Sequence, residues 1–225
     1  MTENIEIVGQ AAITHLGLKH AARERALPKS RAAIRFCANS IRATHRQETA
    51  TAQELLQHAQ ALLEEIEDDL HDHQDIFYAG FLQDAHKEYA EAITFAAMTQ
   101  FHALPIANEL AIGWAAYLNG LAEAVGELRR YVLDQLRRSN FEVCEIYLRY
   151  MDDVYALLVS VDFPDVITSG LRRTTDVTRG ILEKTRGDLT TAVTQAQLQH
   201  SMLSLQQELQ QYASSRSKLP VQEER

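Results

Sequence analysis

Apolar residues recur every three to four positions along most of the chain, which is the spacing of one face of an α-helix. The runs between them are rich in Ala, Leu, Glu, Gln and Arg, which favour helix. No stretch alternates apolar and polar residues with the period of two that marks a strand, and the 225 residues include only 9 Gly and 4 Pro. The pattern predicts an all-α protein.

Proline, glycine and capping residues divide this helical pattern into segments. Pro28 suits the first turn of a helix, so we expect the first two helices to be separate. Pro105 ends another helix, and Gly187 ends or interrupts the last one. The segments predict helices over residues 3–26, 28–45, 52–71, 75–102, 107–118, 115–138 and 141–160, and a last helix that starts at Asp162-Phe163-Pro164.

The last part of the chain has a different pattern. Its large apolar residues alternate at intervals of four and three, which is the seam of a short coiled coil: Leu198, Met202, Leu205, Leu209 and Tyr212. A helix that packs back on its own domain would show the same pattern, and both interpretations stay open. We therefore expect a helical domain over residues 1–188 and a helical extension over 189–225, frayed from Ser214 onward.

Composition places the chain among globular proteins. Hydrophobic residues make up 46% of it, which is enough for a core. Cys37 and Cys144 each lie in a helical run and are expected to be free, buried thiols of a reducing compartment. No signal-peptide pattern and no membrane-length apolar stretch is present, so a cytoplasmic location is expected and membrane binding is not.

Charge is unevenly distributed, although the net charge of −9 alone would disfavour nucleic-acid binding. Residues 19–46 hold eight Lys or Arg and one acid, whereas residues 47–91 hold twelve acids and one base. Four arginines of the basic segment share one helical face: Arg31, Arg35, Arg42 and Arg46. We call them the arginine stripe. It either pairs with the acidic helix at 52–71 or binds phosphates.

A few acidic residues stand among apolar ones, unlike the acidic cluster at 64–72, which is expected to face solvent. Glu88 and Glu91 lie one helical turn apart in a run that is otherwise almost apolar. On a helical wheel, Glu123 and Asp152 fall on faces that are expected to contact solvent. Helical-wheel positions predict that four acids point toward a packed or enclosed region: Glu88, Glu91, Glu127 and Asp153.

Enclosed carboxylates need neutralisation, because burying like charges together is costly. Pairing with Arg129, Arg130, Arg149 or the arginine stripe would achieve it. A divalent cation would achieve it as well, and an all-carboxylate site suits Mg²⁺ or Mn²⁺, which can activate water against a phosphodiester. No Glu-x-x-His pair, P-loop, Cys/His zinc pattern or dinucleotide motif occurs in these segments.

Three blocks that contain these acids resemble the translin/TRAX family, most closely TRAX. Residues 88–92 (EYAEA) resemble its E-Y-x-E-A motif. Residues 117–128 (YLNGLAEAVGEL) resemble its Y-L-x-G-x-A-D…G-E-L block, and Leu148-Arg149 with Asp153 resembles L-R-x-x-x-D. The similarity covers about residues 20–187 and includes Arg186-Gly187. Two departures are a missing basic patch before residue 88 and a longer tail beyond Asp188.

The resemblance implies a seven-helix subunit in a hollow octamer that holds RNA inside. In TRAX-type subunits the two glutamates of E-Y-x-E and the aspartate of L-R-x-x-x-D are metal-dependent RNase residues, whereas translin-type subunits only bind. By position, this implies catalytic and metal-binding roles for Glu88, Glu91 and Asp153, with Glu127 as a fourth.

The sequence therefore predicts a homo-oligomeric, Mg²⁺-dependent (or Mn²⁺-dependent) endoribonuclease for single-stranded RNA. Nucleic-acid contact would rest on the arginine stripe together with Arg129 and Arg130. One alternative is an oligomer that binds single-stranded DNA or RNA without cutting it. Another is a helical scaffold without nucleic acid, for which the 52–71 helix should neutralise the arginine stripe.

Overall fold

A computed structural model describes residues 2–216, which form helices joined by turns and loops and contain no strand. The predicted all-α class is confirmed. The long helices begin and end close to most of the predicted bounds. The elements are α1 (Thr2–His45), α2 (Thr49–Leu70), α3 (Gln74–Phe77), α4 (Gly80–Thr99), α5 (Trp114–Leu136), α6 (Phe141–Ser160), α7 (Asp165–Thr168) and α8 (Leu171–Arg216).

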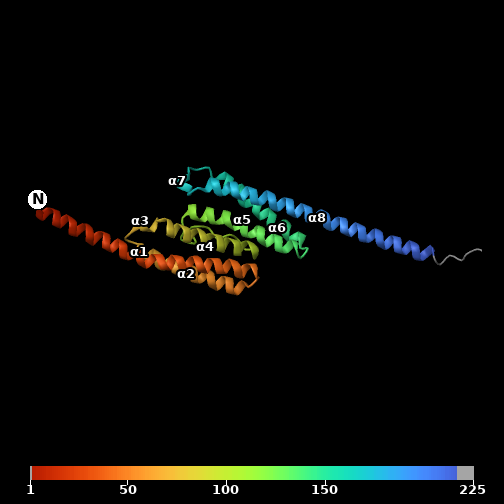
Figure 1. The fold of residues 1–225 in the computed structure, drawn as a ribbon, viewed down its shortest axis with the longest axis horizontal. Coiled ribbons are helices and arrows are strands. Elements are labelled where there is room, and N and C mark those ends of the chain that lie inside the picture. The colour runs from red at the N-terminus through yellow and green to blue at the C-terminus, as the bar shows by residue number, and fades with distance from the viewer. Residues whose placement is uncertain (1, 217–225) are drawn as a thin grey trace, which may run out of the picture.

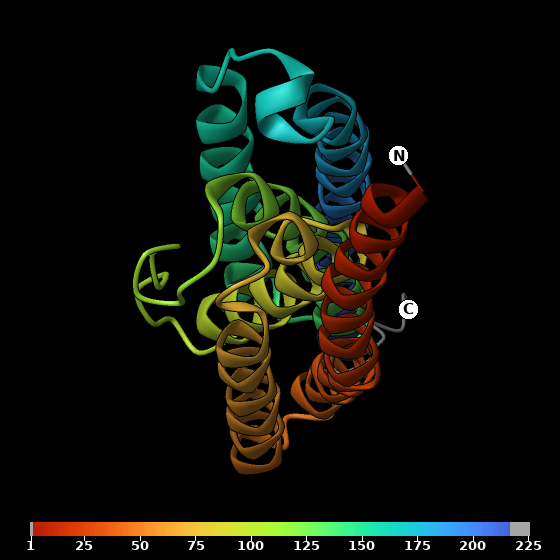
Figure 2. The same ribbon diagram turned by 90° about the vertical axis from the view of Figure 1, so that its left-hand side faces the viewer.

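The helices form an elongated bundle in which α5 is central. α2 packs against the second half of α1, and α4 lies between α1 and α5. On its other sides α5 contacts α6 and α8 (Figure 1). The first part of α1 projects from one end of the bundle, and the last part of α8 projects from the opposite end. Figure 2 looks along the bundle from the end where α1 begins.

The core runs through the bundle and takes residues from α1, α2, α4, α5, α6 and α8. Among its largest fully buried side chains are Tyr89 and Phe95 of α4, Leu121 and Leu128 of α5, and Tyr147 of α6. Complete burial of one such apolar side chain contributes roughly 1.5–3 kcal/mol to folding. Both cysteines are free and buried, as the composition predicts. None of the helices in residues 2–216 is long and apolar enough to cross a membrane.

The predicted break at Pro28 is wrong, because α1 runs through it as one helix of 44 residues. Proline removes one backbone donor and costs about 3 kcal/mol in a helix interior. Burial on both sides of the proline offsets this cost. Ala22 and Ala26 before it, and Ala33 and Cys37 after it, are fully buried on the same face of α1.

Three other predicted bounds also need correction. The short helix expected at 107–118 does not form, because turns occupy 107–111 and α5 starts only after Gly113. The helix expected at 75–102 is divided into α3 and α4. Gly187 neither ends nor interrupts the last helix, which continues through it to Arg216.

The tail does not pack back on its own domain. The five seam residues Leu198, Met202, Leu205, Leu209 and Tyr212 are 56–67% exposed, so that interpretation is wrong. The coiled coil remains a prediction, as does the division of the chain at residue 188. Of the frayed end expected from Ser214, residues 217–225 lie outside the described part of the chain.

Candidate metal centre

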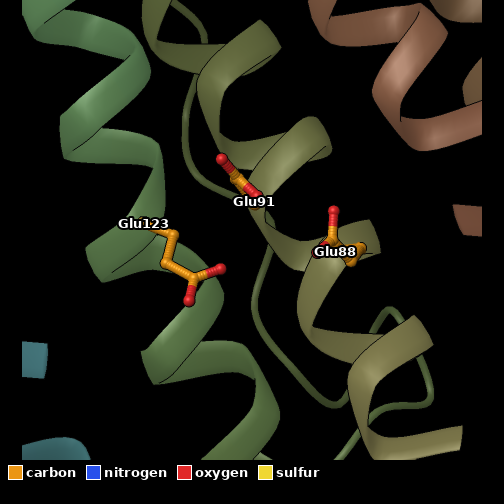
Figure 3. A group of neighbouring side chains, drawn as sticks. All are labelled: Glu88, Glu91 and Glu123. Atoms are coloured by element: carbon orange, nitrogen blue, oxygen red, sulfur yellow. The ribbon is translucent and has the colours of Figure 1, made fainter. Parts of the chain in front are cut away.

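Three glutamates from two helices converge between α4 and α5. Glu88 and Glu91 lie one turn apart on α4, and Glu123 reaches toward them from α5 (Figure 3). One carboxylate oxygen from each lies within 4.8 Å of the other two. All three side chains are half-buried. We call these residues the glutamate cluster. In residues 2–216 they form the one group of three or more His, Cys, Asp or Glu side chains close enough to share an ion.

The cluster forms because α4 and α5 approach unusually closely at Gly120. A Cβ atom at this position would lie 2.3 Å from the carbonyl oxygen of Lys87 and 2.8 Å from the backbone nitrogen of Glu91. Only glycine permits this contact. Glu123 follows Gly120 by three residues and therefore sits on the same side of α5, next to the α4 acids.

Burial and mutual repulsion disfavour the charged form of the α4 acids. Burial, followed by the charges of Glu88, Glu123 and Glu127, raises the pKa of Glu91 to about 8. Burial also raises the pKa of Glu88, and the Lys87 charge only partly opposes this rise. The Lys87 ammonium lies 2.8 Å from a Glu123 oxygen and is the one cation paired with the cluster within the described chain. Three carboxylates with a single cation make a fitting site for a hard divalent ion with oxygen ligands.

Glu127 lies one turn beyond Glu123 and has a partner that the sequence did not indicate. Its Oε2 atom is 2.5 Å from Nε2 of His45, at the end of α1. The hydrogen bond from His45 lowers the pKa of Glu127, against the effect of burial. The other ring nitrogen of His45 is buried without a hydrogen-bond partner. The arginines expected to pair with Glu127 do not do so, although Arg130 contributes to lowering its pKa.

Two expectations for solvent exposure are wrong. Asp153 does not point into an enclosed region: it is exposed on α6 and lies outside the glutamate cluster. Its neighbour Asp152 is the paired residue, with Oδ1 2.6 Å from a guanidinium nitrogen of Arg186. Glu123 was expected to face solvent, and it lies in the cluster instead. Positions on a helical wheel give a direction around one helix, but they do not show where a second helix crosses it.

Some of the Lys and Arg residues of the basic segment, residues 19–46, form ion pairs, and others are exposed without an ion-pair partner in the described part of the chain. Lys29 binds Asp69 and Glu65 of α2, and Arg25 also binds Asp69. Lys19 pairs with Asp75. The acidic helix α2 therefore pairs with Arg25 and Lys29, whereas Lys19 pairs with α3 and Arg23 pairs with Glu24 of its own helix.

The arginine stripe itself remains mostly unpaired. In the stripe, Arg31 and Arg35 are exposed and have no ion-pair partner in residues 2–216. Arg42 donates to Asn39, and Arg46 pairs with Glu48 just beyond the end of α1. The scaffold interpretation requires α2 to neutralise the arginine stripe, and α2 does not do so. Among the other arginines predicted to contact nucleic acid, Arg130 is exposed, whereas Arg129 is bound to Asp188 at 2.7 Å.

Comparison with known proteins identifies relatives. No family model matches the chain. The uncharacterized protein MJ0175 of Methanocaldococcus jannaschii is 32% identical over 199 residues, which cover 86% of each chain. Two solved structures of AfC3PO, one of them a complex with duplex RNA, are 34% identical and superpose with TM-scores of 0.77 and 0.76. Each match covers 82% of this chain and 96% of AfC3PO.

The chain belongs to the translin/TRAX family. The structure of apo-NeC3PO has the same fold, with a TM-score of 0.73 at 17% identity. In the family motif Y-L-x-G-x-A-D…G-E-L, the aspartate stands at the position that Glu123 occupies in this chain. The same block contains Gly120, the residue that permits the close approach of α4. The motif therefore carried a signal for Glu123 that its wheel position obscured. No comparable signal in the sequence indicated His45.

Proposed function

We propose that this protein is a Mg²⁺-dependent endoribonuclease that cuts single-stranded RNA and works as a homo-oligomer. The observation that carries the proposal is the convergence of Glu88, Glu91 and Glu123 at the α4–α5 crossing. Glu88 and Glu91 come from a TRAX-like motif, and Glu123 occupies an acidic position of a second one. A bound Mg²⁺ (or Mn²⁺) supplies a Lewis acid and lowers the pKa of a coordinated water.

Each residue of the centre has a distinct part in this proposal. Glu88, Glu91 and Glu123 would hold the cation through carboxylate oxygens, and Glu91, whose pKa is raised, would give up its proton to solvent when the cation binds. Lys87 fixes the orientation of the Glu123 carboxylate through its ion pair. His45 and Glu127 form a hydrogen-bonded pair next to the cluster that can hold a proton at Nε2 of His45. Asp153 is not assigned to this metal, because it is separated from the cluster.

RNA binding is supported by the relative and by charge. AfC3PO has been crystallised with duplex RNA and is 34% identical over most of this chain. Arg31 and Arg35 lack carboxylate partners in the described chain, so both guanidinium groups are available for phosphates. These arginines would serve equally in an oligomer that binds RNA without cutting it. Only the glutamate cluster favours an endoribonuclease over an oligomer that binds RNA without cutting it.

The deciding experiment is a cleavage assay with end-labelled single-stranded RNA and the corresponding duplex. The wild-type protein should cut single-stranded RNA with Mg²⁺ or Mn²⁺ and lose this activity in EDTA. Glu91→Gln should abolish cleavage while leaving RNA binding intact. Glu67→Gln, on the exposed face of α2, is the matched control and should cut normally. A wild-type protein that binds RNA but is inert with both metals would establish the non-catalytic function instead.

A further inference from the structure

A cavity of about 490 Å³ opens directly beside the glutamate cluster, between α4, α5 and the start of α8. Two residues of the metal centre, Lys87 and Glu123, form part of its wall. Ala116 and Val177 add apolar surface, and Arg173 adds a cation. Its volume lies within the range of roughly 300–1,000 Å³ that is usual for small-ligand pockets. The cavity is therefore large enough for part of a substrate bound at the metal.

A buried hydrogen-bond network holds the α8 side of this cavity in place. Asn119 of α5 is only 6% exposed, and its Oδ1 atom accepts a hydrogen bond of 2.7 Å from the Thr174 hydroxyl. Its Nδ2 atom donates to the backbone oxygen of Thr168 at 2.9 Å. Ser169 and Gly170, both with positive φ, then turn the chain into α8. This network fixes the position of the helix turn that carries Arg173.

Arg173 is the cation of the cavity that has no carboxylate partner. It is exposed, and no ion pair or hydrogen bond joins its side chain to another part of residues 2–216. The adjacent Arg172 differs, because it pairs with Asp162 at 3.3 Å and lines a separate surface pocket. A guanidinium group presents a planar fork of donors that matches a phosphate. The position of Arg173 beside a proposed metal centre therefore suits a phosphodiester.

The charges around the cavity make the binding of an anion depend on the metal. Without a cation, the carboxylates of Asp84 and Glu123 in the cavity wall, with that of Glu88 next to them, outnumber the cations Lys87 and Arg173. A divalent ion in the cluster offsets two negative charges, so a phosphate can then approach Arg173 without net repulsion. RNA should therefore occupy the cavity only when the cluster is loaded.

We infer that this cavity holds the nucleotide adjoining the scissile phosphate, and that Arg173 binds the phosphate of that nucleotide. The inference rests on the proposed function, since the cluster defines which phosphate is cut. It assigns Arg173 a substrate-binding role at the active centre, separate from the arginine stripe on α1. The apolar wall formed by Ala116 and Val177 faces the uncharged part of the nucleotide.

The inference can be tested by RNA binding, independently of cleavage. The titrations use the Glu91→Gln protein with Mg²⁺, so that RNA stays intact while two carboxylates still hold the ion. Adding Arg173→Ala should weaken binding of a single-stranded RNA about tenfold, as expected for one charged hydrogen-bonded contact. It should also reduce the slope of log Kd against log salt by about 0.7, the value for one phosphate of a single strand. Arg173→Lys should retain the slope and lose only part of the affinity, because it keeps the charge without the fork.

Arg172→Ala in the same background is the matched control and should change neither quantity. Circular dichroism melts establish that the Arg173 variants remain folded. If Arg173→Ala binds RNA with the same Kd and salt slope as its parent, the inference is overturned, whether or not the wild-type protein cuts RNA. If the wild-type protein does not cut but the Arg173 effect is present only with Mg²⁺, the phosphate site stands and the endoribonuclease proposal fails.

Discussion

The protein has two groups of acidic residues whose environments are opposite. The α2 group, which comprises the acids of residues 64–69 and Asp72 just beyond the helix end, is dense in sequence and largely exposed, and its least exposed member, Asp69, is paired. The hydrogen bond from Lys29 lowers the pKa of Asp69, and Arg25 adds to this effect. The glutamate cluster is sparse in sequence, half-buried and short of cations, and the pKa values of Glu88 and Glu91 are raised.

This contrast indicates that the density of acidic residues along a sequence does not predict where an ion binds. Exposed ion pairs such as those of α2 contribute only about 0–1 kcal/mol each, because water already solvates both charges. Half-buried carboxylates without partners are destabilising until a cation or proton neutralises them. The glutamate cluster is therefore the part of the molecule where added metal should have the larger effect.

The largest expected effect comes from Glu123→Gln compared with Asp153→Asn. Glu123 lies in the cluster and Asp153 lies apart on α6. Loss of a direct ligand should reduce RNA cleavage at least about 100-fold, since even outer partners of metal ligands contribute 10–100-fold. Asp153→Asn should leave the cleavage rate within a few-fold of the wild type. If Asp153→Asn alone is inactive, the L-R-x-x-x-D assignment is right and the cluster is incomplete.

Gly120→Ala tests how the two helices bring the cluster together. The added methyl group would clash with the α4 backbone at Lys87 and Glu91, so the free energy of unfolding should fall by about 1–3 kcal/mol. Metal binding should weaken as well. Gly126→Ala on the same helix is the control: its Cβ would meet only a side-chain atom of Ile181 at 3.8 Å. It should stabilise the protein by about 0.5–1 kcal/mol, and urea unfolding measures both variants. Equal stability of the two variants would argue against close packing at Gly120.

A third prediction concerns pH. The folded-state pKa of Glu91 is about 8, above its ordinary value of 4.5, so the metal-free protein loses stability as pH rises between these values. A divalent ion must displace the Glu91 proton, and its affinity should therefore rise as pH approaches 8. The increase in melting temperature caused by Mn²⁺ should be larger at about pH 8.5 than at about pH 6.5. A metal effect that is independent of pH would contradict the raised pKa.

The smallest effect is expected in the α2 group. Asp69→Asn removes the carboxylate that Lys29 and Arg25 share at the surface. It should reduce the free energy of unfolding by no more than about 1 kcal/mol. RNA cleavage and Mn²⁺ binding should not change. A large loss of cleavage would show that the α2 acids take part in function and would remove the distinction between the two groups.

Much of the fold follows from local patterns. The predicted α6 bounds at 141–160 match the structure, because Asn140 and the turn before it end one helix and start the next. The predictions that failed depend on tertiary contacts. Packing on both sides of Pro28 keeps α1 continuous, and this packing cannot be inferred from the sequence of α1 alone. His86 of α4 is likewise buried by tertiary contacts beside Phe77, and burial lowers its pKa to about 4.

The candidate site was partly predictable for the same reason. Glu88 and Glu91 are neighbours on one helix, so their spacing places them together. Glu123 joins them only because Gly120 allows α5 to cross α4 at that point. The partner of Glu127 is 82 residues away, at His45, and no sequence spacing connects them. Contacts within one helix could be predicted, whereas contacts between helices required the structure.

The most direct test of the metal centre is anomalous diffraction from crystals soaked in Mn²⁺. The proposed function predicts a manganese peak between α4 and α5, in direct contact with carboxylate oxygens of Glu88, Glu91 and Glu123. A crystal with no peak there, or with the ion bound at Asp153 or at the α2 acids instead, would contradict it.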